Sequence, residues 1–311
     1  MLGFLFLPFY RPAKTANILV YRDIFVRYYT PYIITLVLFS IANALNQKTE
    51  VTETLLNIMK AIYSGSAIDI ETASSMSSLW FLPSLTSMVL LYITYSHCRI
   101  SVRWLICIGF LIVHPFIGML PGHAQSIFPI GLIPAVYAFP LALITINLNY
   151  FFFDRIRPHA AFGLCFIIYC IATYWQILLH LSTEVGFGIV ATLDEPFAIL
   201  INDATGIFGF LSIYYFSCLA SNLATEIIGR YSLPIYLYHQ IVFFIISRFI
   251  GNQNLFLHIY VQAFLSFLLT VFFSFLFAHV LFKFSRIREL IFPKDWNTYK
   301  TLFSRRRIKQ I

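Results

Sequence analysis

Long apolar runs separated by short polar stretches make up most of this chain, and they predict membrane-spanning helices. A helix crosses the roughly 30 Å hydrocarbon core of a bilayer with about 20 residues, and the runs approach or reach that length. The runs are continuous, whereas a membrane β-barrel needs short segments of alternating polarity. The expected spans cover residues 31–45, 79–96, 104–120, 127–150, 161–181, 204–223, 233–250 and 258–283. We therefore predict an all-α, polytopic transmembrane helix bundle with about eight full spans.

The polar segments between the runs define the expected loops. The first loop, residues 46–78, has room for an amphipathic helix around Val51 to Tyr63. A second, acidic loop is expected at residues 182–203, and its last residue is Asp203. On this assignment every acidic residue lies in a loop, a tail or a helix end. We assign residues 1–285 to one membrane domain and residues 286–311 to a basic tail.

Composition supports a membrane protein and argues against nucleic acid as a partner. The chain is 59% hydrophobic and 11% charged, whereas an average soluble domain is about a quarter charged. The net charge is +8, but nine of the 21 basic residues lie from Lys283 onward, which is typical of a topology signal or a headgroup contact. With the segment 9–30 in the cytoplasm, alternate loops put 18 basic residues on that side and three on the other. This bias predicts a cytoplasmic C-terminus.

The five cysteines give no sign of a metal site or a disulfide framework. They lie in or beside apolar runs, and Cys165 and Cys170 have no histidine or cysteine at metal-ligand spacing nearby. We interpret them as small buried apolar residues. No bound metal or cofactor is predicted.

Three short motifs resemble a known family of membrane enzymes. They are GRYSLPIYLYHQ at residues 229–240, LWFLPSL at 79–85 and RDIFVRYYTPY at 22–32. In this order they resemble the signatures of acyltransferase family 3, whose members are integral membrane O-acyltransferases. Residues Met1 to Pro8 are similar to the end of that family's second helix. The resemblance implies that the family's first helix, which carries its main catalytic histidine, is absent from this chain together with most of the second.

The resemblance also implies a reaction and a location. It points to acetyl-CoA as the acyl donor and to a sugar hydroxyl of an envelope polysaccharide or glycolipid as the acceptor. The expected partners are therefore acyl-CoA, a glycan or glycolipid and the lipid bilayer, in a bacterial inner membrane. The absent helix makes it an open question whether this chain alone is active.

The segment 229–240 supplies the candidate catalytic residues. Ser232 is a good helix N-cap, with Pro234 suited to the first turn, and Ser232, Tyr236 and His239 fall near one helix face. An imidazole inside a membrane is costly and is usually turned toward a protein interior. The alternative is a structural histidine paired with a neighbouring helix.

The candidate substrate-binding residues are basic or aromatic. Arg22, Arg27 and Arg230 lie where phosphates of acyl-CoA would meet the inner face, although arginines there also act as membrane anchors. Trp80 and Phe81 are expected to anchor a helix at the membrane interface or, alternatively, to form a platform for the acceptor sugar.

A transporter, flippase or polysaccharide polymerase of the envelope is the second interpretation. Such proteins share the hydropathy of this chain, and carboxylates inside the membrane favour transport. The loop assignment of the acidic residues argues against it. His114 precedes Pro115 within an expected span and is interpreted as structural.

Overall fold

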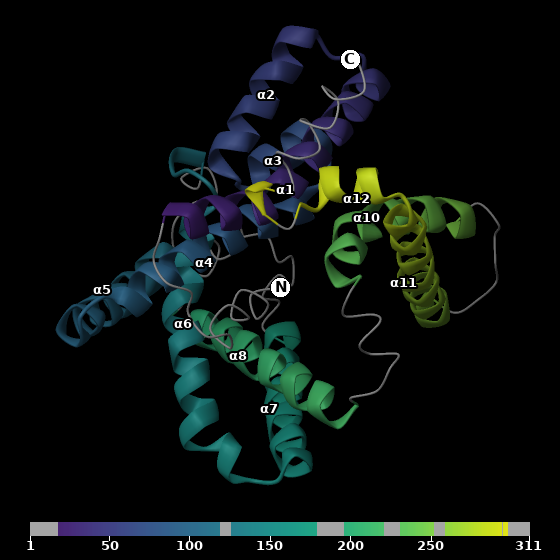
Figure 1. Ribbon diagram of the computed structural model, residues 1–311. Helices are drawn as coiled ribbons and strands as arrows, with labels where there is room; N and C mark the ends of the chain where they lie inside the picture. Colours follow the sequence, from purple (N-terminus) through teal and green to yellow (C-terminus); the bar gives the residue numbers. More distant parts are fainter. Residues whose placement is uncertain are drawn as a thin grey trace. The chain divides into compact units, whose positions relative to one another are not determined.

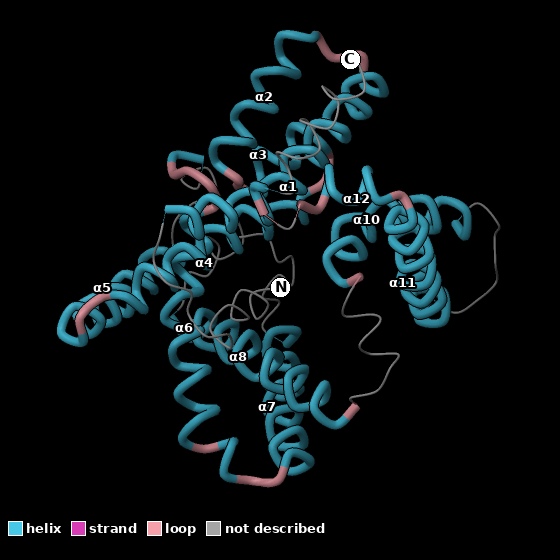
Figure 2. Tube along the Cα trace, in the orientation of Figure 1, coloured by secondary structure: helices cyan, strands magenta, loops and turns pink. Residues whose placement is uncertain are grey.

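A computed structural model describes residues 18–118, 126–178, 196–220, 231–251, 259–293 and 295–297 (Figure 1). Within these residues all regular structure is helical (Figure 2). The chain divides into unit 1, Met1–Ala220, and unit 2, Ser221–Ile311, and each unit is described by itself. The predicted residues Met1 to Pro8 and Arg230 lie outside the described residues, as does most of the basic tail.

The helices of both units follow the apolar runs of the sequence. In unit 1 they are α1 (Ile18–Gln47), α2 (Val51–Ser64), α3 (Ala67–Ser74), η2 (Ser77–Trp80), α4 (Phe81–His97), α5 (Ile100–Gly118), α6 (Leu132–Phe151), η4 (Phe153–Arg155), α7 (Pro158–Leu178) and α8 (Pro196–Leu219). In unit 2 they are α10 (Ser232–Gly251), α11 (Ile259–Lys283) and α12 (Ser285–Ile291).

Six of the described helices, α1, α5, α6, α7, α8 and α11, are long and apolar enough to cross a membrane. This confirms the prediction of an all-α membrane bundle. The other two expected spans coincide with α4, which has 17 residues, and α10, which has 20. The amphipathic helix expected around Val51 to Tyr63 is α2.

Helix α1 is longer than the sequence predicts. It begins at Ile18, well before the expected span, and has 30 residues with Pro31 inside it. At 1.5 Å per residue it is about 45 Å long, more than a bilayer core requires. The basic residues Arg22 and Arg27, expected to precede the helix, therefore lie on it.

Hydroxyl groups of α1 fix the end of α2. Tyr32 donates a 2.5 Å hydrogen bond to the carbonyl of Ala61, and Tyr29 donates to the carbonyl of Ile62. Both tyrosine side chains are buried. The Ala61 carbonyl also accepts the Gly65 N–H, so Tyr32 gives it a second hydrogen bond. Tyr29 satisfies the Ile62 carbonyl, which lies in the last turn of α2, where backbone carbonyls lack a partner within the helix.

Two glycines allow α2, α4 and α6 to meet. Gly65 ends α2 with φ +60°, and a Cβ there would lie 2.4 Å from Cβ of Pro83. Gly131 precedes α6 with φ +59°, and a Cβ there would lie 2.7 Å from the backbone nitrogen of Ser84. The Gly131 N–H donates to the Ser64 carbonyl at 2.6 Å. No side chain fits at either position.

Substituting Gly65→Ala is therefore expected to lower the stability of the protein by about 2 kcal/mol, because the left-handed conformation strains an L-residue and the new methyl meets Pro83. Thermal unfolding of the purified protein in detergent measures this. Gly163→Ala is the matched control, since a Cβ there meets no atom within 4 Å. In the second turn of α7 this substitution should leave stability unchanged or raise it by up to about 1 kcal/mol. Equal melting temperatures for the two variants would contradict the close packing at Gly65.

In unit 2, α10 and α11 pack antiparallel. The Tyr231 ring contacts Phe282 near the end of α11, and the Tyr238 ring lies 5.0 Å from that of Phe277. One face of α11 carries small residues four apart, and close helix packing in membranes favours such residues. They are Ser266, Thr270, Ser274 and Ala278, all buried.

Candidate functional site

The predicted catalytic residues lie together at the start of α10. Ser232 is the first residue of the helix and is exposed, while Tyr236 and His239 are half-buried on the next two turns. The Tyr236 and His239 rings are 5.6 Å apart. The proximity of the Tyr236 and His239 rings agrees with their spacing of three residues. Ser232, predicted to be the N-cap, is instead the first residue within the helix.

One nitrogen of His239 is held by its own helix. Nδ1 lies 2.5 Å from the backbone carbonyl of Tyr236. A carbonyl only accepts hydrogen bonds, so Nδ1 carries a hydrogen, and a neutral ring then has its lone pair on Nε2. Among the described residues Nε2 has no hydrogen-bond partner. This is the state in which an imidazole can accept a proton from a substrate.

Gln240 adds a second polar group at the same level of α10. Its Oε1 atom is buried and has no hydrogen-bond partner among the described residues. A buried polar atom without a partner is costly, and in hydrocarbon the cost is greater still. Two hydrogen-bond acceptors, Oε1 of Gln240 and Nε2 of His239, thus lie on adjacent residues of an apolar helix. Neither atom has a partner among the described residues.

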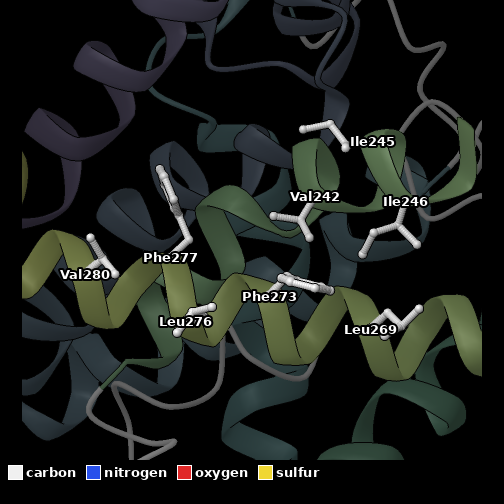
Figure 3. A pocket seen from close by; sticks show the side chains of 8 residues that line it. All are labelled: Val242, Ile245, Ile246, Leu269, Phe273, Leu276, Phe277 and Val280. Carbon is white, nitrogen blue, oxygen red and sulfur yellow. The ribbon is translucent and has the colours of Figure 1, made fainter. Parts of the chain in front are cut away.

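A cavity of about 590 Å³ lies between α10 and α11 (Figure 3). Aliphatic and phenylalanine side chains line it, including Val242, Phe273 and Phe277. Among the lining residues that the structure describes none is polar, and none of them could bind a phosphate or activate a hydroxyl. Its walls do not include His239.

The predicted arginines lie on α1 in unit 1. The Arg22 guanidinium is 3.6 Å from the Asp23 carboxylate, and both side chains are about one third exposed. Arg27 is exposed, and its guanidinium lies 5.6 Å from the centre of the Tyr28 ring. The two arginines are close in sequence but point in different directions around the helix, because five residues correspond to about 140°.

The predicted aromatic platform is buried. Trp80 is 2% exposed and Phe81 7%, and their rings pack edge-on at 6.4 Å. Neither ring presents an open face, so a sugar would reach them only after neighbouring side chains moved. The role of Trp80 and Phe81 in acceptor binding stays a prediction.

A buried polar cluster that the sequence did not predict joins α5, α6 and α8. Nε2 of His114 lies 2.8 Å from Oδ2 of Asp203, and the Tyr137 hydroxyl donates to Oδ1 of Asp203 at 2.6 Å. All three residues are buried. The assignment of Asp203 to a loop was wrong, because α8 begins at Pro196 and Asp203 lies about two turns inside it.

The hydrogen bonds of this cluster define its proton content. Nδ1 of His114 is 3.0 Å from the Tyr137 carbonyl and therefore carries a hydrogen. The contact between Nε2 and Asp203 then needs one further proton, on the imidazole or on the carboxyl group. In either form the pair is neutral overall. Both ring nitrogens are occupied, so His114, unlike His239, has no lone pair free to act as a base.

A second polar cluster joins the other ends of α6 and α8. The Tyr215 hydroxyl lies 2.7 Å from Oδ1 of Asn149 and 3.1 Å from Oδ1 of Asp154. Asn149 also donates to Asp154 at 3.0 Å. The pairs Tyr137–Asp203 and Asn149–Tyr215 are both separated by 66 residues, so α6 and α8 run parallel and in constant register.

Fold and site together define an integral membrane protein of the α-helical class. In the described part of the chain, no group of three or more histidine, cysteine, aspartate or glutamate residues could hold a metal ion. No family model matches the sequence, and no curated protein or solved structure shows detectable similarity to it.

Proposed function

We propose that the protein is a membrane O-acyltransferase. It would transfer an acetyl group from acetyl-CoA to a sugar hydroxyl of an envelope polysaccharide or glycolipid. It would act in the bacterial inner membrane, with its basic C-terminal tail in the cytoplasm. The proposal rests on the three ordered motifs and on the chemistry that their residues can perform.

The observation that supports this function most is the state of His239. With Nδ1 bound to the Tyr236 carbonyl, Nε2 is available to take the proton of an acceptor hydroxyl. The hydroxyl oxygen then bonds to the acetyl carbon while the thioester C–S bond breaks, and the proton passes from His239 to the CoA thiolate. Hydroxyls of Ser232 and Tyr236 would donate hydrogen bonds to the developing oxyanion.

The arginines of α1 suit the donor. Arg22 and Arg27 would bind phosphates of CoA, since guanidinium groups form strong charge-assisted hydrogen bonds with phosphate. The second group of predicted residues, Trp80 and Phe81, would have to become accessible before it could hold the acceptor.

Labelled acetyl-CoA tests the function directly. Membranes that contain the protein should transfer labelled acetyl groups to envelope glycan, and membranes from the same host without it should not. If purified, folded protein reconstituted with acetyl-CoA and an envelope glycan extract transfers no label, the proposal fails for this chain.

Transport of an envelope lipid or polysaccharide is the second candidate, and Asp203 is the observation that favours it. A carboxylate buried within a membrane span, paired with a histidine, is the kind of group that transporters use. The two functions respond differently to detergent. Acyl transfer persists in solubilised protein, whereas transport requires a sealed membrane.

A further inference from the structure

One direct contact, and one made through the end of α2, set the register of α1 against α4. At one end, the hydroxyls of Tyr21 and Thr94 lie 3.2 Å apart. At the other, Tyr32 bonds to the Ala61 carbonyl, which also accepts the N–H of Gly65, and Gly65 lies against Pro83. Because eleven residues separate the contacts on each helix, α1 and α4 run antiparallel in constant register.

This register places Arg27 beside the middle of α4. Counting six residues from Tyr21 and from Thr94 brings Arg27 level with Met88, about 15 Å along the helix from Cys98. At that end Arg103 caps α4 by donating to the carbonyls of Ser96 and Cys98. A guanidinium there is typical of a membrane surface.

The start of α4 can also be placed relative to a membrane-spanning helix. The start of α6, a candidate span, packs against Ser84 through Gly131. Met88 lies one turn beyond Ser84, so the Arg27 level is inside the thickness that α6 crosses. An exposed guanidinium at this depth is unfavourable in hydrocarbon, where a central arginine costs about 2.5–3.5 kcal/mol or more, and such residues usually face protein or water.

Polar residues recur along this face of α1 at helical spacing. Asp23 lies one turn from Arg27 at i−4, and Thr30 follows at i+3. Phe25, which is 38% exposed, lies about 160° away around the helix and offers an apolar surface at nearly the same depth. One side of this segment thus suits water and the other suits lipid.

We propose that the face of α1 carrying Asp23, Arg27 and Thr30 lines a water-filled recess inside the membrane. The recess opens at the end of the bundle that holds the α4–α5 turn, and Arg27 lies at its deep end. The ligand class that such a recess takes is a small anionic group, because the guanidinium is the deepest charge in it. This inference rests on geometry and does not depend on the proposed acyl transfer.

Cysteine labelling tests the recess. In a background with the five native cysteines replaced, Arg27→Cys and Phe25→Cys are treated with a membrane-impermeant thiol reagent in vesicles of both orientations. We expect Arg27→Cys to react at least about tenfold faster, since only a thiol in contact with water ionises and reacts readily. Equal rates overturn the proposal: if both react, this part of α1 is outside the membrane, and if neither reacts, there is no recess.

A second variant tests the anion preference with Arg27 in place. Thr30→Cys should react faster with an anionic than with a cationic methanethiosulfonate, and Arg27→Gln should lower that rate ratio by about tenfold. Arg99→Gln, at the α4–α5 turn, is the control and should change the ratio less. An unchanged ratio in Arg27→Gln would rule out Arg27 as the group that attracts anions.

Discussion

Replacing Asp203 with alanine should destabilise unit 1 by about 3–5 kcal/mol, because it leaves Nε2 of the buried His114 without its partner and removes one hydrogen bond of the Tyr137 hydroxyl. Melting of the purified protein in detergent measures the loss. Thr205→Ala, on the same helix, is the control, since its hydroxyl bonds only to the Ile201 carbonyl among the described residues. Asp203→Ala should lower the melting temperature far more.

A double variant separates pairing from packing. His114→Phe combined with Asp203→Leu replaces both polar partners by apolar groups and should be less destabilising than Asp203→Ala. If the single and double variants melt together, the cluster contributes packing alone. If Asp203→Ala melts with the parent protein, the cluster is not buried as described.

Loss of the His239 imidazole should strongly slow the proposed acetyl transfer. His239→Ala is expected to lower the rate by at least about 10²-fold, the usual contribution of a general base. His279→Ala removes another imidazole from unit 2, one that lies 3.2 Å from the Tyr231 hydroxyl, and should retain activity. Initial rates with labelled acetyl-CoA, measured on equal amounts of folded protein, make the comparison.

The role of Tyr236 can be separated from that of His239. The contact with Nδ1 uses the Tyr236 backbone carbonyl, so Tyr236→Phe keeps it, and any loss of rate measures the hydroxyl alone. Full activity in His239→Ala would refute the assignment of the base even if the protein proves to be an acyltransferase.

The sequence was sufficient to predict the helical architecture. Hydropathy located the spans now seen as α5, α6, α7 and α11 to within several residues, because a continuous apolar run has few alternatives in a bilayer. The amphipathic α2 was also predicted from its spacing. Neither the extent of α1 nor the start of α8 could be obtained this way, since charged residues near the end of a span lower the hydropathy signal.

Pairing across the sequence was the main feature that could not be predicted. His114 and Asp203 are 89 residues apart; His114 is a single polar residue within one apolar run, and Asp203 lies at the margin of another. Only the packing of α5, α6 and α8 shows that each satisfies the other. The one sequence signal for this cluster was the pair Asn202–Asp203, which directly precedes an apolar segment. A longer α8 would have placed this pair inside the span.

Sequence alone also predicted only part of the candidate site, because it shows spacing within a helix but not contacts between distant residues. Spacing within one helix brings Ser232, Tyr236 and His239 together, because residues three and four apart share a face. The burial of Trp80 and Phe81 depends on neighbours that are distant in sequence, and composition at an expected membrane boundary does not reveal them.

The constant register between α6 and α8 also limits how unit 1 can change shape. Polar pairs near both ends of the two helices would have to break together if one helix slid along the other by a turn of 5.4 Å. A piston-like stroke between them is therefore unfavourable. Any conformational cycle in this unit should carry α6 and α8 as a single rigid body, with tilting confined to their neighbours.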